Sequence, residues 1–394
     1  MDPSVTSPSF SSSASSSSWF AGIVRGRSVK SSSGGGAPSI PVSTDGVGPG
    51  SRKNQLRGAL FKYGPKPIQV AFKTGEFNQQ VIFVGGLTDG LLATEYLEPL
   101  SIALENTKWS LVQPLLSSSY IGYGTSSLDQ DSLELDQLIG YLINKENSEG
   151  VVLLGHSTGC QDIVHYLRTN LACSKAVRGV ILQAPVSDRE YRATLPETSE
   201  MIDLAAKMIG EGRGMELMPR EANPDAPITA YRYHSLCAYM GDDDMFSSDL
   251  SDDQLRLRLG HMSSTPCQVI FSMADEYVPD YVDKKALVER LCRALGGAEK
   301  VEIDWGNHGL SNRVQEAVQA IMDFVIFSMA DEYVPDYVDK KALVERLCRA
   351  LGGAEKVEID WGNHGLSNRV QEAVQAIMDF VKREGPKGWD DPWS

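Results

Sequence analysis

Residues 151–160 read VVLLGHSTGC, an apolar run that leads into the pattern Gly-x-Ser-x-Gly. The apolar run predicts a buried strand, and the residues that follow the pattern predict a helix. A serine on a sharp turn between a strand and a helix is the nucleophile elbow. Gly155 and Gly159 suit this turn because it is strained and because the helix packs close to the strand. We therefore expect Ser157 to be a nucleophile, with a structural serine in a tight turn as the alternative.

Short apolar runs alternate with amphipathic segments on both sides of this turn. Six strands are predicted in this way, at 81–86, 109–116, 150–155, 178–185, 267–275 and 300–305. Helices are predicted between them, one of which opens with Ser127 and Gln130 at capping-box spacing. The alternation predicts an α/β fold, with a mostly parallel sheet and helices on both faces, over residues 56–325.

Residues 187–264, called the insertion below, break this alternation. An insertion of this length between two strands is most simply a cap over a site. Part of it, GDDDMFSSDLSDDQ, is acidic and could attract a cationic or metal-bearing substrate. We favour the simpler interpretation of a solvated surface that caps a helix, because Ser251 and Gln254 again have capping-box spacing.

A nucleophilic serine needs a base, and the base needs an acid that orients it. Of the six histidines, only His308 and its copy His364 follow a late strand in a Gly-rich loop, WGNHGLSN, where an elbow fold presents its base. His156 lies inside the elbow and suits packing better than proton transfer. A loop histidine bonded to the backbone is the alternative for His308.

The acid is expected between the serine and the histidine in sequence. Asp275, at the end of the strand that reads CQVIFSMAD, has a suitable position. Asp188, after the preceding strand, and Glu276 are the alternatives. An oxyanion hole needs two N–H groups, which we assign to Thr158 and to Leu87 in FVGGLTDG.

These stretches also resemble a known family. VIFVGGLTDG, LLGHSTGCQD, QAPVSDRE, ADEYVP and WGNHGLSN are similar to the eukaryotic α/β-hydrolase family that includes the fusarinine C esterase. The resemblance covers about residues 56–325 and implies an α/β-hydrolase fold and a Ser/Asp/His ester hydrolase of the carboxylesterase class. The roles carry over to Ser157, Asp275 and His308, but the substrate does not.

The chain contains a tandem duplication, because residues 270–325 recur unchanged as residues 326–381. Two identical copies indicate a duplicated exon or a sequence-assembly error rather than a solenoid. Asp331 and His364 are therefore alternates to Asp275 and His308. We favour the first copy, since strands of a second copy would lie two places further out, roughly 10 Å away. The tail at 382–394 directly follows the second copy and could dock on the domain. An arrangement that pairs Asp275 with His364 is therefore an alternative.

The remaining composition limits the possible partners. The net charge of −15 and the absence of a basic stripe disfavour nucleic acid, and no apolar run approaches the length of a membrane span. The cysteines lack metal-site spacing, so we expect no metal and no cofactor. Residues 1–55 predict a disordered Ser/Gly-rich tail. We expect a soluble, cytoplasmic protein, with a chloroplast or another organelle as the alternative if the tail is a transit peptide.

The expected partner is a small-molecule ester, and the oligomeric state is not predicted. A hydrolase-fold receptor that binds a small molecule with little turnover is the alternative from another functional class.

Overall fold

The structure, a computed structural model, describes residues 55–328 and 375–376. Most of the predicted Ser/Gly-rich tail, nearly all of the second copy and the segment 382–394 lie outside the described residues. The chain divides into two compact units, Met1–Met322 and Asp323–Ser394. All residues of the candidate site in the first copy belong to the first unit.

The first unit is built on an eight-stranded sheet with the order β1-β2-β4-β3-β5-β6-β7-β8. Strands β3 to β8 run parallel, whereas β1 and β2 pair antiparallel with their neighbours. The strands are β1 (Ala59–Lys62), β2 (Val70–Lys73), β3 (Gln79–Val84), β4 (Trp109–Pro114), β5 (Gly150–His156), β6 (Val177–Gln183), β7 (Cys267–Ser272) and β8 (Glu299–Ile303). The predicted strands are confirmed, and the carboxyl ends of the parallel ones meet at one edge, where ligands bind in such sheets.

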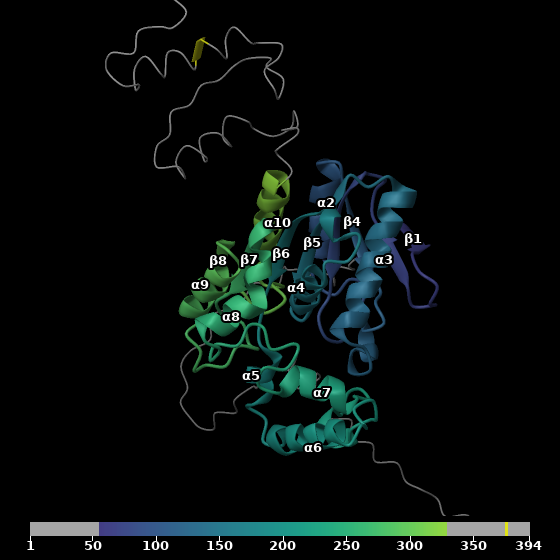
Figure 1. Cartoon of the computed structure of the whole chain (residues 1–394). Coiled ribbons are helices and arrows are strands. Elements are labelled where there is room, and N and C mark those ends of the chain that lie inside the picture. The colour runs from purple at the N-terminus through teal and green to yellow at the C-terminus, as the bar shows by residue number, and fades with distance from the viewer. Residues whose placement is uncertain (1–54, 329–374, 377–394) are drawn as a thin grey trace, which may run out of the picture. The chain divides into compact units, whose positions relative to one another are not determined.

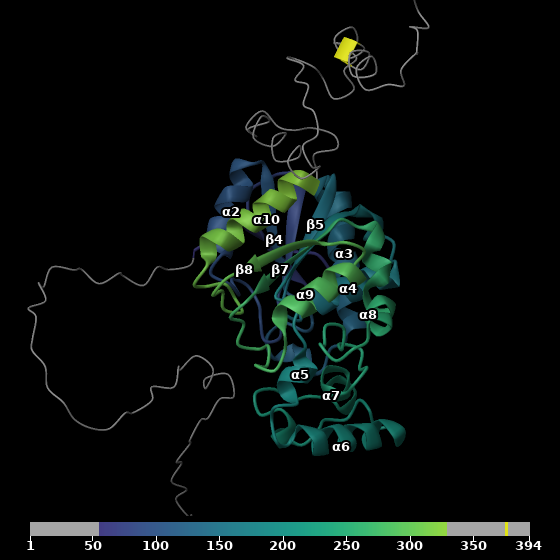
Figure 2. The same ribbon diagram turned by 90° about the vertical axis from the view of Figure 1, so that its left-hand side faces the viewer.

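Helices cover both faces of this sheet. Figures 1 and 2 show α2 (Leu97–Asn106) on one face, and α3 (Leu128–Glu146), α4 (Gly159–Thr169) and α9 (Lys284–Ala294) on the other. Central strands such as β5 and β7 are buried along their whole length, as expected for a sheet covered on both faces. The fold is thus the expected α/β sheet with helices on both faces.

The predicted capping box at the start of α3 forms only in part. The Ser127 side chain accepts from the Gln130 N–H, but the Gln130 side chain donates to Glu134 instead of returning to Ser127. At α8 (Asp252–Leu259) both bonds of the Ser251–Gln254 box are present. The spacing alone therefore predicts where the helix begins but not both hydrogen bonds.

The insertion contributes helices α5 (Asp188–Arg192), α6 (Thr198–Gly210) and α7 (Ala230–Cys237), which lie together beyond one end of the sheet in both views (Figures 1 and 2). They have a hydrophobic cluster of their own that includes Ala205, Met208 and Ile228. Helix α8, in the same sequence range, packs instead against α9. The helices that lie beyond the sheet are therefore only part of the insertion.

The acidic stretch of the insertion is not simply a solvated surface, which corrects the simpler sequence interpretation. Asp243 and Asp244 are each only 2% exposed. Asp243 forms a buried ion pair with Arg232 at 2.6 Å, and Asp244 lies 3.0 Å from the Nε of Arg189. These carboxylates neutralise arginines of the insertion because an unpaired buried charge would be costly.

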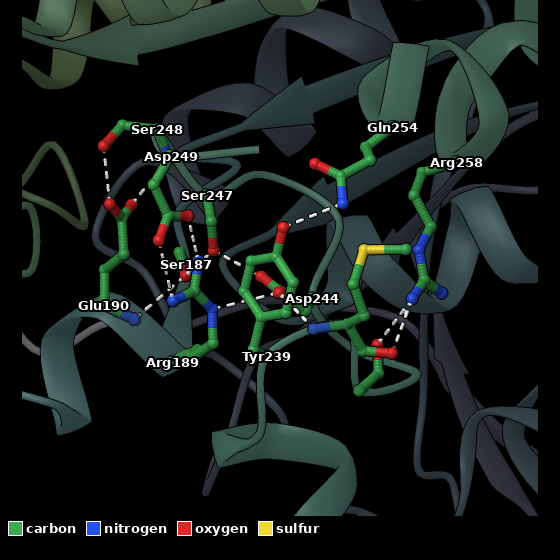
Figure 3. A network of polar contacts seen from close by, with 12 residues as sticks. Ser187, Arg189, Glu190, Tyr239, Asp244, Ser247, Ser248, Asp249, Gln254 and Arg258 are labelled. Atoms are coloured by element: carbon green, nitrogen blue, oxygen red, sulfur yellow. Dashed lines mark hydrogen bonds and ion pairs between the residues drawn. The ribbon is translucent and has the colours of Figure 1, made fainter. Parts of the chain in front are cut away.

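Figure 3 shows how this stretch holds α5 in place. The Ser187 and Ser247 hydroxyls are 2.5 Å apart, and Glu190 accepts from the N–H of Ser248 at 2.9 Å. Arg189 also pairs with Asp249 and lies over the ring of Tyr239. The network fixes the short helix that contributes residues to the pocket described below.

Helix α10 (Val314–Ser328) runs across the junction between the two copies. The sequence predicts a new strand at Ile326, as in the first copy, but the described residues Ile326–Ser328 are helical. No turn residue separates Val325 from Ile326, so adding further turns to an existing helix is favourable. The remainder of the second copy lies outside the described residues, except for Gln375 and Ala376.

Candidate functional site

Ser157 lies on the turn between β5 and α4, as the sequence predicts. Its φ of 54° is in the left-handed region, which is costly for a residue with a side chain. The turn is held by a hydrogen bond from the Ser157 N–H to the carbonyl of Gln183 at 3.0 Å. This is the strained geometry of an elbow, which presents a serine hydroxyl at the carboxyl edge of the sheet.

The two glycines of the motif allow this close approach. A Cβ on Gly155 would lie 2.8 Å from the carbonyl oxygen of Gly159, and a Cβ on Gly159 would lie 2.1 Å from that of Val84. Neither distance is possible without moving the backbone. The glycines are therefore required by the packing of α4 against β3 and β5.

A second tight turn follows β3 and faces the serine. The Gly86 N–H donates to Asp89 Oδ2 at 2.7 Å, and a Cβ on Gly86 would lie 2.7 Å from that of Ser157. Among the described hydrogen bonds, none is donated by the N–H of Leu87 or of Thr158. Both N–H groups are thus available to a ligand, as an oxyanion hole requires. Leu87 lines the pocket, and Thr158 lies at the start of α4, where its side chain makes no capping hydrogen bond.

His308 is joined to Asp275. The Nδ1 atom of His308 lies 2.8 Å from Asp275 Oδ2, and both side chains are buried. The second carboxylate oxygen of Asp275 accepts from the N–H of Tyr277 at 2.9 Å. Burial lowers the pKa of His308. The negative charge of Asp275 and its hydrogen bond with His308 outweigh this effect, so the pKa of His308 is raised overall. The pairing leaves Nε2 as the ring nitrogen that can exchange a proton with another group.

The alternative acids have other contacts. Asp188 accepts from the Thr158 hydroxyl and from Gln161, each at 3.3 Å. Glu276 accepts from the main-chain N–H of His308 at 2.9 Å. Neither carboxylate has a described bond to the His308 ring, so Asp275 is the acid that the structure places beside it. Asp331 and His364 lie outside the described residues.

One pocket of about 620 Å³ brings these groups together. Its lining includes Ser157, His308 and Leu87, while Asp275 is not part of the lining and reaches the site through its contact with His308. No hydrogen bond between Ser157 and the His308 ring is found among the described residues, and such bonds are often long in the absence of substrate. The charged residues of the described lining are Asp89, Glu95, Asp188, Arg192 and Glu276.

Several residues that line the pocket or contact the two histidines near it were not predicted from the sequence. Tyr191 and Arg192 come from α5, and Tyr277 follows Asp275 with its ring centroid 4.5 Å from that of His308. Gln183 ends β6 and contacts both histidines near the serine. The only signal for Gln183 was its place at the carboxyl end of a predicted parallel strand, where functional residues gather.

Among the described residues, no group of three or more His, Cys, Asp or Glu side chains could hold a metal ion. No helix in this part of the chain has the length and apolar character needed to cross a membrane.

Several known proteins are similar in sequence to this chain. The chain is 33% identical over 293 residues to the fusarinine C esterase of Aspergillus fumigatus. The aligned region covers 60% of this chain and 83% of that protein. It is 37% identical over 234 residues to a UPF0613 protein of Schizosaccharomyces pombe, covering 55% of this chain and 74% of the relative.

Solved structures that resemble this chain have the α/β-hydrolase fold. A siderophore hydrolase from Aspergillus fumigatus is 30% identical and matches 71% of this chain and 99% of its own, with a TM-score of 0.59. An α/β-hydrolase fold protein of unknown function is 25% identical with a TM-score of 0.56, over 70% of this chain and 97% of that one. The family described as "protein of unknown function (DUF1749)" matches residues 50–323. The chain therefore belongs to the DUF1749 family and has the α/β-hydrolase fold.

Proposed function

We propose that this chain is a carboxylic ester hydrolase that uses Ser157 as nucleophile, His308 as base and Asp275 as orienting acid. The observation that carries the proposal is the shared pocket, in which Ser157 on its strained turn and the Asp275-bound His308 face the same space. The names of relatives in Aspergillus fumigatus, a fusarinine C esterase and a siderophore hydrolase, support ester hydrolysis.

In the first half of the proposed reaction, Ser157 Oγ attacks the ester carbonyl while His308 Nε2 takes the hydroxyl proton. Asp275 holds the Nδ1–H and stabilises the imidazolium that forms. The N–H groups of Leu87 and Thr158 donate to the oxyanion. Collapse of the tetrahedral intermediate breaks the ester C–O bond, and the alcohol leaves with the proton from His308.

In the second half, water replaces the alcohol. His308 takes a proton from the water, whose oxygen attacks the acyl carbon and breaks its bond to Ser157 Oγ. The serine regains its proton from His308, and the carboxylic acid is released. Both halves use the same base and the same oxyanion donors.

The charge of the pocket supports a preference among esters. Four carboxylates line it against the single guanidinium of Arg192 among the described lining residues. Such a field attracts cationic substrates and repels anionic ones. We therefore propose neutral and cationic small-molecule esters as substrates, and fusarinine C, named for one relative, belongs in the panel to be tested.

The test is turnover of a p-nitrophenyl ester together with labelling by a fluorophosphonate. The wild type should turn over repeatedly and be labelled, and Ser157→Ala should lose both while unfolding at the same temperature. Ser110→Ala, which changes a buried serine near the other end of the sheet, is the matched control and should keep both. Turnover that survives Ser157→Ala would refute the mechanism, and ligand binding without turnover would favour a receptor.

A further inference from the structure

Gln183 is a fully buried residue that touches both the serine turn and the histidine loop. It is the last residue of β6, beside β5 and β7, and it does not line the pocket. Its main-chain carbonyl accepts from the Ser157 N–H at 3.0 Å. Its side-chain Nε2 donates to the main-chain carbonyl of His308 at 2.9 Å. One residue thus holds the backbone of both groups that are proposed to exchange a proton.

The orientation of the Gln183 amide follows from these bonds. A carbonyl oxygen only accepts, so the group that faces the His308 carbonyl must be the NH₂. The amide oxygen then points the other way, where it lies 2.6 Å from His156 Nδ1 and 3.2 Å from the Tyr96 hydroxyl. Because the oxygen cannot donate, His156 Nδ1 must carry the proton. A neutral His156 then has no proton on Nε2.

The environment of His156 makes this tautomer relevant to the site. Burial lowers the pKa of His156, against the charge of Asp89, so the neutral ring is favoured. Its Nε2 lies 3.8 Å from Asp89 Oδ2, the atom that accepts from the Gly86 N–H at 2.7 Å. With no proton on Nε2, His156 cannot donate a hydrogen bond to Asp89 Oδ2, which therefore accepts from the Gly86 N–H alone among these two groups. The turn that carries Leu87 keeps its hydrogen bond.

We infer that Gln183 is a positioning residue, which fixes the His308 loop relative to Ser157 and selects the tautomer of His156. The inference rests on the proposed function of Ser157 and His308. Gln183 contacts no substrate in this arrangement and acts only through its neighbours. Its hydrogen bonds connect the serine turn, the histidine loop and His156, whose ring lies beside Asp89 of the Leu87 turn.

The cost of losing Gln183 should be in catalysis as well as in stability. Without the amide, the buried carbonyl of His308 and the Nδ1–H of His156 have lost their partner, which destabilises the fold. The loop can then shift, and a shift of about 1 Å in a catalytic group can reduce the rate by roughly 100-fold.

The first experiment compares Gln183→Met with Gln80→Met. Gln80 is a matched control, since it is also fully buried and its amide donates to a main-chain carbonyl, that of Phe77, at the start of β3. Both variants should lose similar thermal stability. Only Gln183→Met should lower kcat, by about 10- to 100-fold with KM nearly unchanged. Equal kcat in the two variants would overturn the inference.

A second variant, Gln183→Glu, keeps the shape of the side chain. It tests the same inference if Gln183→Met does not fold. The protonated carboxyl can donate to the His308 carbonyl and accept from His156, whereas the ionised carboxylate cannot donate. Burial raises the pKa of such a group. Activity should therefore fall with rising pH, over a range where the wild type stays active. A pH profile parallel to that of the wild type would contradict the positioning role.

A spectroscopic measurement separates this inference from the proposed function. In nitrogen-15 spectra of the wild type, His156 should show a protonated Nδ1 and an unprotonated Nε2, and Gln183→Met should change that pattern. The result does not depend on the reaction that the protein performs. A wild-type His156 protonated on Nε2 would refute the inference, while an active Ser157→Ala would refute only the proposed mechanism.

Discussion

Ile270–Ser272 and Ile326–Ser328 have the same three residues, yet the first set lies in strand β7 and the second ends helix α10. Pro266 precedes the first set, and the strand begins at Cys267 and pairs with β6 and β8. In the second copy the same three residues directly follow Val325 and continue helix α10. The comparison shows that neighbouring elements decide which structure these three identical residues adopt.

The difference extends to the candidate site. Asp275 and His308, both from the first copy, meet at 2.8 Å beside the pocket of Ser157. One serine can use one base, so we expect the corresponding residues of the second copy to be dispensable. Paired substitutions in the two copies test this directly.

The largest effect is expected for the two histidines. His308→Ala removes the proposed base and should lower kcat on the order of 10⁶-fold, as loss of the triad histidine does in a well-characterised serine protease. His364→Ala should leave kcat close to the wild-type value. Steady-state turnover of a p-nitrophenyl ester measures both. If His364→Ala is the inactive variant, the assignment to the first copy is wrong.

The two aspartates should differ in the same way. Asp275→Asn should lower kcat on the order of 10⁴-fold, because the amide favours the wrong tautomer of His308. Asp275 also contributes to the raised pKa of His308, so its loss lowers that pKa. Since the base acts in its neutral form, the acidic limb of the kcat/KM profile should move to lower pH. An unmoved limb would argue against the pairing, and Asp331→Asn is the control.

A smaller effect is expected for the two glutamates. Glu276→Gln removes one negative charge from the pocket lining, whereas Glu332→Gln changes the same letter in the second copy. For a trimethylammonium ester, kcat/KM should fall about threefold in Glu276→Gln, and added salt should reduce the difference. The neutral isostere, in which a tert-butyl group replaces the trimethylammonium group of the same ester, should show no change. Equal losses for both esters would mean that charge is not the cause.

The smallest effect is expected for removal of one copy. Because the copies are identical and adjacent, deletion of either gives the same chain of 338 residues, 56 fewer than the 394 of this protein. All described pocket residues lie at or before Ser311, so this chain should keep kcat/KM within about twofold. A large loss would show that the second copy contributes to the site.

Much of the fold follows from local pattern. The apolar runs predicted the strands correctly, because a sheet that is covered on both faces requires near-continuous apolar residues. The elbow at Ser157 was equally local, since its glycines are needed by contacts within a few residues of the turn and with the adjacent strand. The pairing of Asp275 with His308 was a prediction from sequence order, and it remains part of the proposed mechanism.

Other features depended on contacts between distant segments. The sequence suggested that the acidic stretch is solvated, but Asp243 and Asp244 are buried beside arginines of α7 and α5. Likewise, nothing in the letters around Gln183 showed that its amide would bond to a histidine 125 residues later in the chain. The carboxylate pairs form when the insertion packs its own segments together, and the Gln183 bond forms when the sheet brings strand ends together.

The sequence by itself determined the succession of strands along the chain, the serine turn and the family to which the protein belongs, because these depend on local periodicity and on glycines at fixed spacing. Only the tertiary structure decided which acid meets His308, which carboxylates are buried, and that Ile326–Ser328 continue a helix. The physical reason is that charge pairing, burial and strand pairing are set by neighbours in space, and the same residues can have different neighbours.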